Sequence, residues 1–134
     1  MPCLHDPDQN STDLDKAMKQ ILIKIEENSK VNEKILHKII ITGCLGDRFD
    51  HNLSSFSNLL RYSLFLESSE LVKNFTIQII HQNSIITCIL PGKTMYNRSL
   101  FLEKKQDVGL FPLSGPCKKI ETSGLKWNLG LLKQ

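Results

Sequence analysis

Hydrophobic residues near the start of the chain repeat with the spacing of one helical face. They fall at i, i+4, i+7, i+8 and i+11, which is the period of an amphipathic helix: Leu14, Met18, Ile21, Leu22 and Ile25. Asp15 lies three residues after Thr12, in the arrangement of a capping box. The pattern predicts a helix over residues 12–27.

A different pattern appears at residues 38–42. Ile39, Ile40 and Ile41 are β-branched and do not alternate with polar residues, which is typical of a strand covered on both faces in a parallel sheet. After a loop at 43–50, the apolar residues return to helical spacing at Leu53, Phe56, Leu59, Leu60 and Leu64. Strand, loop and helix therefore predict half of a βαβ unit.

From Phe75 onward the pattern consists of short β-rich pieces. These are FTIQII, SIITCIL, SLFL, DVGLFPL and the last segment before Trp127, and they are separated by the turn-forming stretches HQNS, PGK, EKKQ, SGP and TSG. The predicted fold class is α/β followed by antiparallel β, with the change near residue 70.

Composition excludes some classes of function. Lys and Arg number 17 against 14 acids, a net charge of +3, and the basic residues are scattered, whereas nucleic-acid binding usually needs a clustered basic face. No run of 18 apolar residues is present, so we expect no membrane span. Four widely spaced cysteines and a start without an apolar signal region favour the cytoplasm: Cys3, Cys44, Cys88 and Cys117.

The stretch GCLGDRFDH at 43–51 follows the predicted strand without a spacer. It packs two glycines, an arginine, two acids and a histidine into nine residues. Ligands of open α/β sheets bind outside the carboxyl ends of the strands. The placement therefore predicts a catalytic or ligand-binding loop.

Five stretches together resemble the thiamine pyrophosphokinase family: DPDQNSTDLDKAM (6–18), GCLGDRFDH (43–51), LPGK (90–93), GLFPL (109–113) and TSGLKWNL (122–129). The resemblance implies diphosphate transfer from ATP to thiamine with Mg²⁺, giving thiamine diphosphate and AMP. It also implies a homodimer with shared active sites. Residues 1–70 would be the C-terminal part of an α/β ATP-binding domain, and residues 71–134 the N-terminal part of a β-sandwich thiamine-binding domain.

The resemblance assigns the metal and the nucleotide to the first helix and to the residues just before it. Magnesium is usually held by one or two carboxylates together with phosphates, so Asp8 and Asp13 become candidate ligands, with Gln9 between them near the nucleotide. A helix N-terminus also favours an anion such as phosphate. The alternative is that Asp13 and Asp15 only favour the first helical turn electrostatically.

Within the loop, Gly43 and Gly46 would let the backbone approach a phosphate, and Arg48 would clamp phosphate oxygens with its planar fork. Asp50 would bind magnesium or orient the attacking hydroxyl, so that Asp50, Arg48 and Asp13 are the candidate catalytic residues. The alternative is a surface pair of Arg48 with Asp50, with Asp50 or His51 capping the helix that follows.

The thiamine side is assigned to the TSGLKW string. Trp127 would stack on the thiamine ring, with a cation–π contribution of roughly 0.5–2 kcal/mol. Thr122 and Ser123 would hydrogen-bond the aminopyrimidine, and Gly124 suits the turn that presents them. A single tryptophan in a β protein is more often a core residue, which is the alternative interpretation.

The chain departs from the family pattern in two ways. Cys44 and Asp47 stand where the family usually has small residues, mostly glycine, and Asp47 would place like charge beside a triphosphate. Family members also extend further at both ends, so this sequence resembles a shortened form with impaired activity. The alternative function is a non-catalytic fragment that binds thiamine or nucleotide, or that interacts with another subunit.

Overall fold

The computed structural model describes residues 5–29, 37–69, 75–96 and 107–130. It divides into two compact units, Met1–Pro91 and Gly92–Gln134. Each unit is described by itself. The domain boundary expected between residues 70 and 71 stays a prediction.

The first helix, α1, covers Asp13–Ser29, which confirms the helix predicted from the apolar series. Its N-terminus is closed by the predicted residue pair: the Asp15 N–H donates to Thr12 Oγ1 at 3.2 Å, and the Thr12 hydroxyl donates to Asp15 Oδ2 at 3.0 Å. The Thr12 carbonyl accepts the first helical bond from the Lys16 N–H at 3.0 Å. Thr12 therefore acts as the N-cap, and the helix begins one residue later than the sequence pattern suggested.

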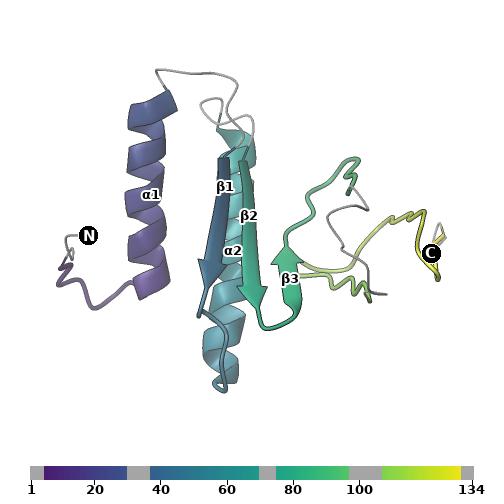
Figure 1. The fold of residues 1–134 in the computed structure, drawn as a ribbon, viewed down its shortest axis with the longest axis horizontal. Coiled ribbons are helices and arrows are strands. Elements are labelled where there is room, and N and C mark those ends of the chain that lie inside the picture. Colours follow the sequence, from purple (N-terminus) through teal and green to yellow (C-terminus); the bar gives the residue numbers. More distant parts are fainter. Residues whose placement is uncertain (1–4, 30–36, 70–74, 97–106, 131–134) are drawn as a thin grey trace. The chain divides into compact units, whose positions relative to one another are not determined.

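Three strands form one mixed sheet in the order β1-β2-β3 (Figure 1). Strand β1 covers His37–Thr42, helix α2 covers Phe49–Ser68, and strand β2 covers Phe75–His81. β1 and β2 are parallel, with Ile39 opposite Ile77 and Ile41 opposite Ile79. β3, Ser84–Thr87, pairs antiparallel with β2.

The parallel pairing of β2 corrects the expectation that every piece after residue 75 belongs to the antiparallel part. β2 completes a βαβ unit with β1 and α2, and a crossover helix returns the chain to the same end of the sheet, so the second strand must run parallel to the first. Antiparallel pairing begins only at the His81–Ser84 turn, where Gln82 has a positive φ of 48°.

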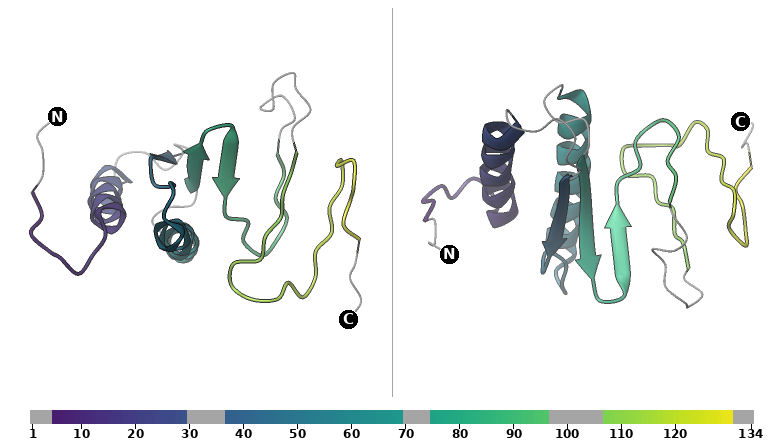
Figure 2. Two further views of the ribbon diagram at one scale, coloured as in Figure 1. Left: turned by 90° about the horizontal axis from the view of Figure 1, so that it is seen from below. Right: turned by 45° about the horizontal axis from the view of Figure 1, so that its top comes forward.

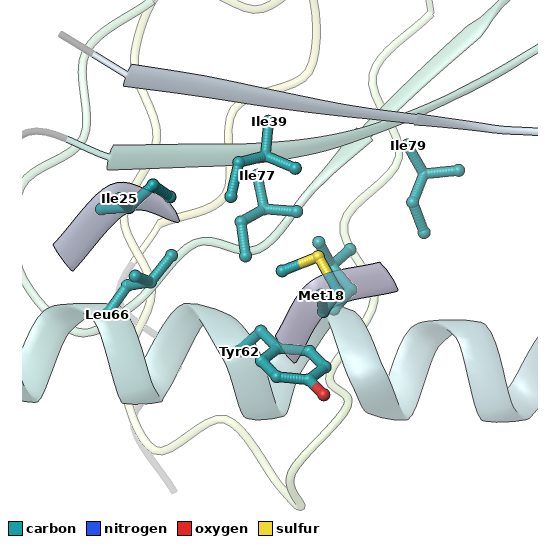
Figure 3. Packing of buried hydrophobic residues seen from close by; sticks show 8 residues of the cluster. Met18, Ile25, Ile39, Tyr62, Leu66, Ile77 and Ile79 are labelled. Carbon is teal, nitrogen blue, oxygen red and sulfur yellow. The ribbon is translucent and has the colours of Figure 1, made fainter. Parts of the chain in front are cut away.

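α2 lies across one face of this sheet, and α1 lies on the same side, next to the edge strand β1 (Figure 2). In Figure 3, Ile39, Ile77 and Ile79 point from the sheet toward α2, and Met18 of α1 lies between them. Met18, Leu59 and Ile79 are the largest fully buried side chains of this core. The hydrophobic burial that stabilises the first unit is thus concentrated between one sheet face and two helices.

In the described part of the chain, the opposite face of the sheet is uncovered at β1, so the prediction of a strand covered on both faces is wrong. Ile40 is 51% exposed, although its neighbour Ile39 is buried. α1 and α2 share one side, so among the described residues no helix covers the Ile40 side. The apolar run of β1 therefore has one buried face and one uncovered face.

The described residues of the second unit, 92–96 and 107–130, contain no helix or strand. The strands expected in DVGLFPL and before Trp127 are not formed there, because a strand requires a neighbouring backbone with which to exchange hydrogen bonds. The strand expected in SLFL lies outside the described residues. The β-sandwich stays a prediction. Neither described helix is long and apolar enough to cross a membrane.

Candidate functional site

The loop between β1 and α2 forms an open pocket of about 340 Å³ at the carboxyl end of β1. Gly43 has a φ of +72°, a conformation that favours glycine, and it turns the chain away from the strand. The pocket is lined by Gly43, Cys44, Leu45, Gly46, Asp47, Arg48 and His51. The sequence-predicted ligand loop therefore lines a shallow hollow that is open to solvent.

Two side chains of α2 hold this loop by its backbone. Asn52 Oδ1 accepts from the Gly46 N–H at 2.9 Å, and Asn52 Nδ2 donates to the Gly46 carbonyl at 2.8 Å. One turn further on, the buried Ser55 hydroxyl donates to the Cys44 carbonyl at 2.8 Å. Because the Gly46 N–H is already engaged, Gly46 contributes to the loop shape rather than offering its amide to a phosphate.

Arg48 and Asp50 form the surface pair that was the alternative interpretation of this loop. Arg48 Nε and Nη2 donate to the two oxygens of Asp50 at 3.2 and 2.5 Å, and the side chains are 68% and 64% exposed. These hydrogen bonds lower the pKa of Asp50 and raise that of Arg48. The pairing orients the Arg48 guanidinium. Both side chains stay exposed to solvent, so each can still exchange its partner for a ligand.

The capping part of that alternative is wrong. The N-cap of α2 is Arg48, with φ −81° and ψ 112°, and no side chain makes a cap hydrogen bond there. Asp50 is the second residue of α2, where its charge favours the first turn. His51 is exposed and lines the pocket.

Charge in the loop is unfavourable to a polyphosphate. Asp47 is exposed and lines the pocket beside Arg48, whose single positive charge is already paired with Asp50. The three residues Asp47, Arg48 and Asp50 therefore carry a formal charge of −1. Asp47 thus lies where the predicted repulsion of a phosphate would act, and the repulsion itself stays a prediction.

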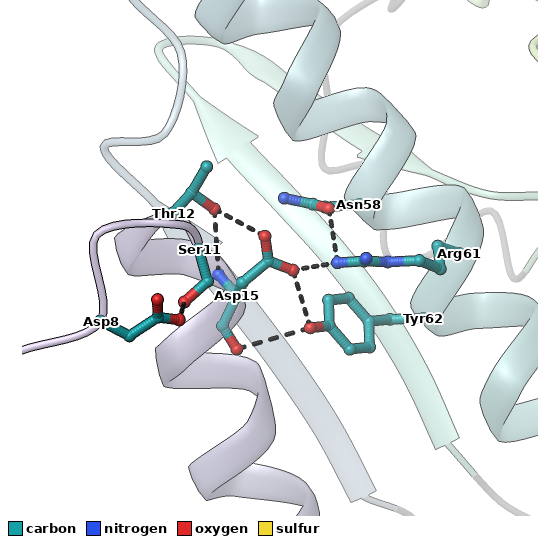
Figure 4. Close-up of polar contacts among 7 residues, drawn as sticks. All are labelled: Asp8, Ser11, Thr12, Asp15, Asn58, Arg61 and Tyr62. Carbon is teal, nitrogen blue, oxygen red and sulfur yellow. Dashed lines mark hydrogen bonds and ion pairs between the residues drawn. The ribbon is translucent and has the colours of Figure 1, made fainter. Parts of the chain in front are cut away.

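The approach to α1 is a compact acidic turn (Figure 4). Asp8 accepts from the Asn10 N–H at 2.8 Å and from the Ser11 hydroxyl. The hydrogen bond from Ser11, followed by that from Asn10, lowers the pKa of Asp8, so this carboxyl is ionised at neutral pH. Gln9 is exposed and donates to the Pro7 carbonyl at 3.5 Å. Asp13 is the exposed first residue of α1.

A polar cluster that the sequence did not suggest joins α1 to α2 (Figure 4). Asp15 Oδ1 accepts from the Tyr62 hydroxyl at 2.9 Å and from Arg61 Nη2, which also donates to Asn58 Oδ1 at 2.9 Å. The Arg61 guanidinium lies 4.8 Å from the centroid of the Tyr62 ring. No local pattern signals these contacts, because Asp15 and Tyr62 are 47 residues apart in sequence.

The TSGLKWNL stretch forms a closed loop in the second unit. The Thr122 N–H donates to the Leu129 carbonyl at 3.0 Å, and the Leu129 N–H donates to Thr122 Oγ1 at 2.7 Å. Gly124 has a φ of +83°, which suits the turn expected there. Ser123 is exposed. The Thr122 oxygen is thus occupied as an acceptor, while its hydroxyl proton is still available to a ligand.

Trp127 lies on this loop and is 80% exposed. Lys126 Nζ lies 5.4 Å from the centroid of the Trp127 ring. A largely exposed aromatic ring in a loop is not a core residue, so the alternative interpretation of Trp127 does not describe this structure. The ring is open to stacking with a ligand.

The candidate metal ligands are not brought together as one set. Among the described residues, no group of three or more His, Cys, Asp or Glu side chains could hold a metal ion. Asp8 and Asp13 belong to the approach to α1, whereas Asp50 belongs to α2 and pairs with Arg48. The protein side chains described here therefore do not fit a resident metal site, although an exposed carboxylate can still contact a metal that arrives with phosphates.

An α/β unit with its pocket at the carboxyl end of a parallel strand belongs to the broad class of α/β ligand-binding domains. Comparison with known protein families identifies the family within this class. The family described as "Thiamin pyrophosphokinase, catalytic domain" matches residues 1–72, and "Thiamin pyrophosphokinase, vitamin B1 binding domain" matches residues 98–131. The chain belongs to the thiamine pyrophosphokinase family.

Curated relatives agree with this assignment. The chain is 30% identical over 128 residues to Thiamine pyrophosphokinase 2 of Oryza sativa subsp. japonica, covering 93% of this chain and 42% of the relative. It is 32% identical over 124 residues to Thiamine pyrophosphokinase 2 of Arabidopsis thaliana, covering 91% and 40%. It is 25% identical over 126 residues to Thiamin pyrophosphokinase 1 of Caenorhabditis elegans, covering 94% and 46%. The chain thus spans less than half the length of these relatives, and no solved structure matches it significantly.

Proposed function

We propose that this chain carries the nucleotide loop and the thiamine loop of a thiamine pyrophosphokinase, which transfers diphosphate from ATP to thiamine and releases AMP. The observation that carries the proposal is the pocket at the carboxyl end of β1, formed by residues 43–51 within the part of the chain that matches the catalytic domain. The exposed Trp127 loop, within the vitamin B1 binding match, supports the second half of the proposal.

In this proposal the nucleotide contacts Gln9 and Arg48, and Gly43 and Gly46 shape the loop that receives it. Arg48 exchanges Asp50 for phosphate oxygens, because a guanidinium fork matches the geometry of both partners and the existing pair is exposed. Gly43 provides the left-handed turn that opens the pocket. Gly46 holds the loop shape through its bonds with Asn52.

Asp50 and Asp13 complete the proposed catalytic set. Diphosphate transfer needs little covalent help from the protein, so their roles are to orient the attacking hydroxyl of thiamine and to contact the metal that accompanies ATP. Release of Asp50 from Arg48 would free its carboxylate for that role. Asp13 is exposed at the start of α1, next to the Asp8 turn.

Magnesium enters as part of the ATP complex. The phosphates supply most of its oxygen ligands, with Asp8, Asp13 and Asp50 as the proposed protein carboxylates. Ionised carboxylates suit this role, but Asp8 would first have to release Ser11 and Asp50 would have to release Arg48.

Thiamine is proposed to stack on Trp127 and to bond with Thr122 and Ser123. The exposed indole ring, the free hydroxyl of Ser123 and the closed Thr122–Leu129 loop are compatible with this arrangement. A homodimer with shared active sites is proposed as the assembly. The cytoplasm is the proposed location, supported by free thiols at Cys44, Cys88 and Cys117.

The second candidate function is a non-catalytic fragment that binds thiamine or nucleotide, or pairs with another subunit. It is favoured by the formal charge of −1 over Asp47, Arg48 and Asp50, which opposes binding of a polyphosphate at the loop. Thermal stabilisation by thiamine or Mg-ATP, together with AMP formation, tests both functions. Stabilisation with AMP formation above background, even if slow, favours an impaired enzyme, and stabilisation with no AMP above background favours the fragment.

A further inference from the structure

The loop of the candidate nucleotide pocket is held by side chains rather than by neighbouring backbone. The carboxamide of Asn52 binds both polar backbone groups of Gly46, at 2.9 and 2.8 Å, and Ser55 binds the carbonyl of Cys44 at 2.8 Å. Asn52 is half-buried and Ser55 is buried. Three backbone groups of the loop thus depend on the first two turns of α2.

The chemistry of the Gly46 contact is specific to a carboxamide. Gly46 offers one donor and one acceptor, and an asparagine side chain offers one of each on the same planar group. Aspartate at neutral pH can accept but not donate, and alanine can do neither. The Asn52 side chain is therefore matched to Gly46 in a way that its smaller or charged replacements are not.

No steric constraint requires a glycine at position 46. A Cβ built at Gly46 would meet no atom within 4 Å, and its φ lies outside the left-handed region, in contrast to Gly43 at +72°. The shape of the loop at this point therefore depends on the bonds with Asn52 rather than on the absence of a side chain.

We infer that Asn52 is a positioning residue for nucleotide binding, which sets the loop that presents Arg48 to the phosphates. The connection is short: the Asn52 N–H donates to the Arg48 carbonyl at 3.2 Å, while the Asn52 side chain holds Gly46, two residues before Arg48. The backbone bond to Arg48 is the first bond of α2, which any residue except proline would make, so the particular contribution of Asn52 is its side-chain bonding to Gly46. The inference rests on the proposed function, since it assigns Arg48 to the nucleotide.

The test compares Asn52→Ala with Ser57→Ala, a matched control at an exposed position of the same helix. Mg-ATP and thiamine affinities are measured separately by calorimetry on the full chain. Asn52→Ala is expected to weaken Mg-ATP binding by about tenfold or more, because a small misplacement of a binding group is costly. Thiamine affinity is expected to stay unchanged, and Ser57→Ala is expected to behave as the unmodified chain.

A second pair of variants separates geometry from charge. Asn52→Asp keeps the acceptor for the Gly46 N–H but loses the donor, and Ser57→Asp adds the same charge to an exposed site of α2. Asn52→Asp is expected to weaken Mg-ATP binding more than Ser57→Asp. In amide exchange measurements, the Gly46 N–H should lose protection in Asn52→Ala and keep it in Ser57→Ala.

The outcomes distinguish this inference from the proposed function. Equal Mg-ATP affinities of Asn52→Ala and Ser57→Ala would overturn the positioning role alone. If Asn52→Ala loses affinity for Mg-ATP and for thiamine alike and also melts at a lower temperature, Asn52 only stabilises the fold. That result would also overturn the positioning role. Failure of the unmodified chain to bind Mg-ATP would overturn the proposed function, and the positioning role with it.

Discussion

The hydroxyl of Tyr62 on α2 donates a hydrogen bond of 2.9 Å to Asp15 Oδ1 at the first turn of α1. The Asp15 side chain is only 15% exposed, and it also pairs with Arg61. This contact fixes the start of α1, and with it the Asp8 turn, against the helix that follows the candidate nucleotide loop. It is therefore both a packing contact and a link between two parts of the proposed site.

Tyr62→Phe should lower the free energy of unfolding by about 1.5 kcal/mol, because it removes a partly buried hydrogen bond to a charged group. Arg61→Ala should cost less than about 1 kcal/mol, because the Arg61 side chain is 58% exposed and solvent screens its ion pair. Urea denaturation of the two variants measures both values. A larger loss for Arg61→Ala would show that the ion pair, and not the hydroxyl, joins the helices.

The contribution of Asp15 should disappear in acid. Partial burial acts to raise the pKa of Asp15, but the hydrogen bonds from Tyr62 and Thr12 and the charge of Arg61 outweigh it, so the pKa lies below its usual value. The folded state thus favours the carboxylate, and its contribution is present above about pH 4 and is lost as the pH falls through the folded-state pKa. The stability difference between the unmodified chain and Asp15→Asn should shrink below pH 4. A difference that stays constant from pH 7 to pH 3 would contradict this assignment.

Substitution of Asp50 should distinguish its pairing with Arg48 from its proposed contact with the metal. Asp50→Asn should strengthen binding of ATP in EDTA, because Arg48 becomes free and one negative charge is removed from the loop. The same variant should weaken binding of Mg-ATP, as should Asp13→Asn, if these carboxylates contact the metal. Stability should change little in either variant, since both acids are exposed. Calorimetric titrations with and without magnesium provide the measurement, and a gain in both conditions would remove Asp50 from the metal.

Thiamine should quench the fluorescence of Trp127, which is the only tryptophan of the chain. The ring is 80% exposed, so a stacked ligand would change its surroundings strongly. Trp127→Ala should weaken thiamine binding by about 1–3 kcal/mol, by analogy with stacking of bases on aromatic side chains. Lys126→Ala is the control, and quenching should persist without it. Unchanged emission at saturating thiamine would place the thiamine site elsewhere.

The sequence predicted the elements that depend on neighbouring residues. The Thr12–Asp15 cap, the strand at β1 and the helix α2 follow from spacing over a few residues, and all three are formed. The loop at residues 43–51 was predicted to bind a ligand because ligands of open α/β sheets bind at the carboxyl ends of the strands. The loop does line an open hollow there, and the binding of a ligand stays a prediction. These features required no knowledge of distant contacts.

Pairings across the chain were harder to predict. The parallel partner of β1 was missed although the βαβ half was recognised, because the signal that β2 completes it lies in the topology and not in FTIQII itself. Tyr62 and Arg61 contact Asp15 only after α1 and α2 pack together. The signal that pointed to Asn52 was its position as a polar residue in the first turn of a helix, where side chains commonly bind loop backbone.

The purified chain should release AMP from ATP and thiamine at or near the background rate. Arg48, the only Lys or Arg among the residues that line the described pocket, is paired with Asp50, and Asp47 adds a second negative charge beside it. Loss of one preorganised charge-stabilising group typically costs about 10²–10³ in rate.

Asp47→Gly alone should not restore the reaction, because it removes one charge but leaves Arg48 engaged by Asp50. The measurement couples AMP formation to an optical signal with saturating ATP, thiamine and magnesium. Turnover near about one per second, within the ordinary enzyme range, would contradict the prediction. Such a rate would require Arg48 to exchange Asp50 for phosphate with little cost, and Asp47 to be neutralised by the metal that accompanies ATP.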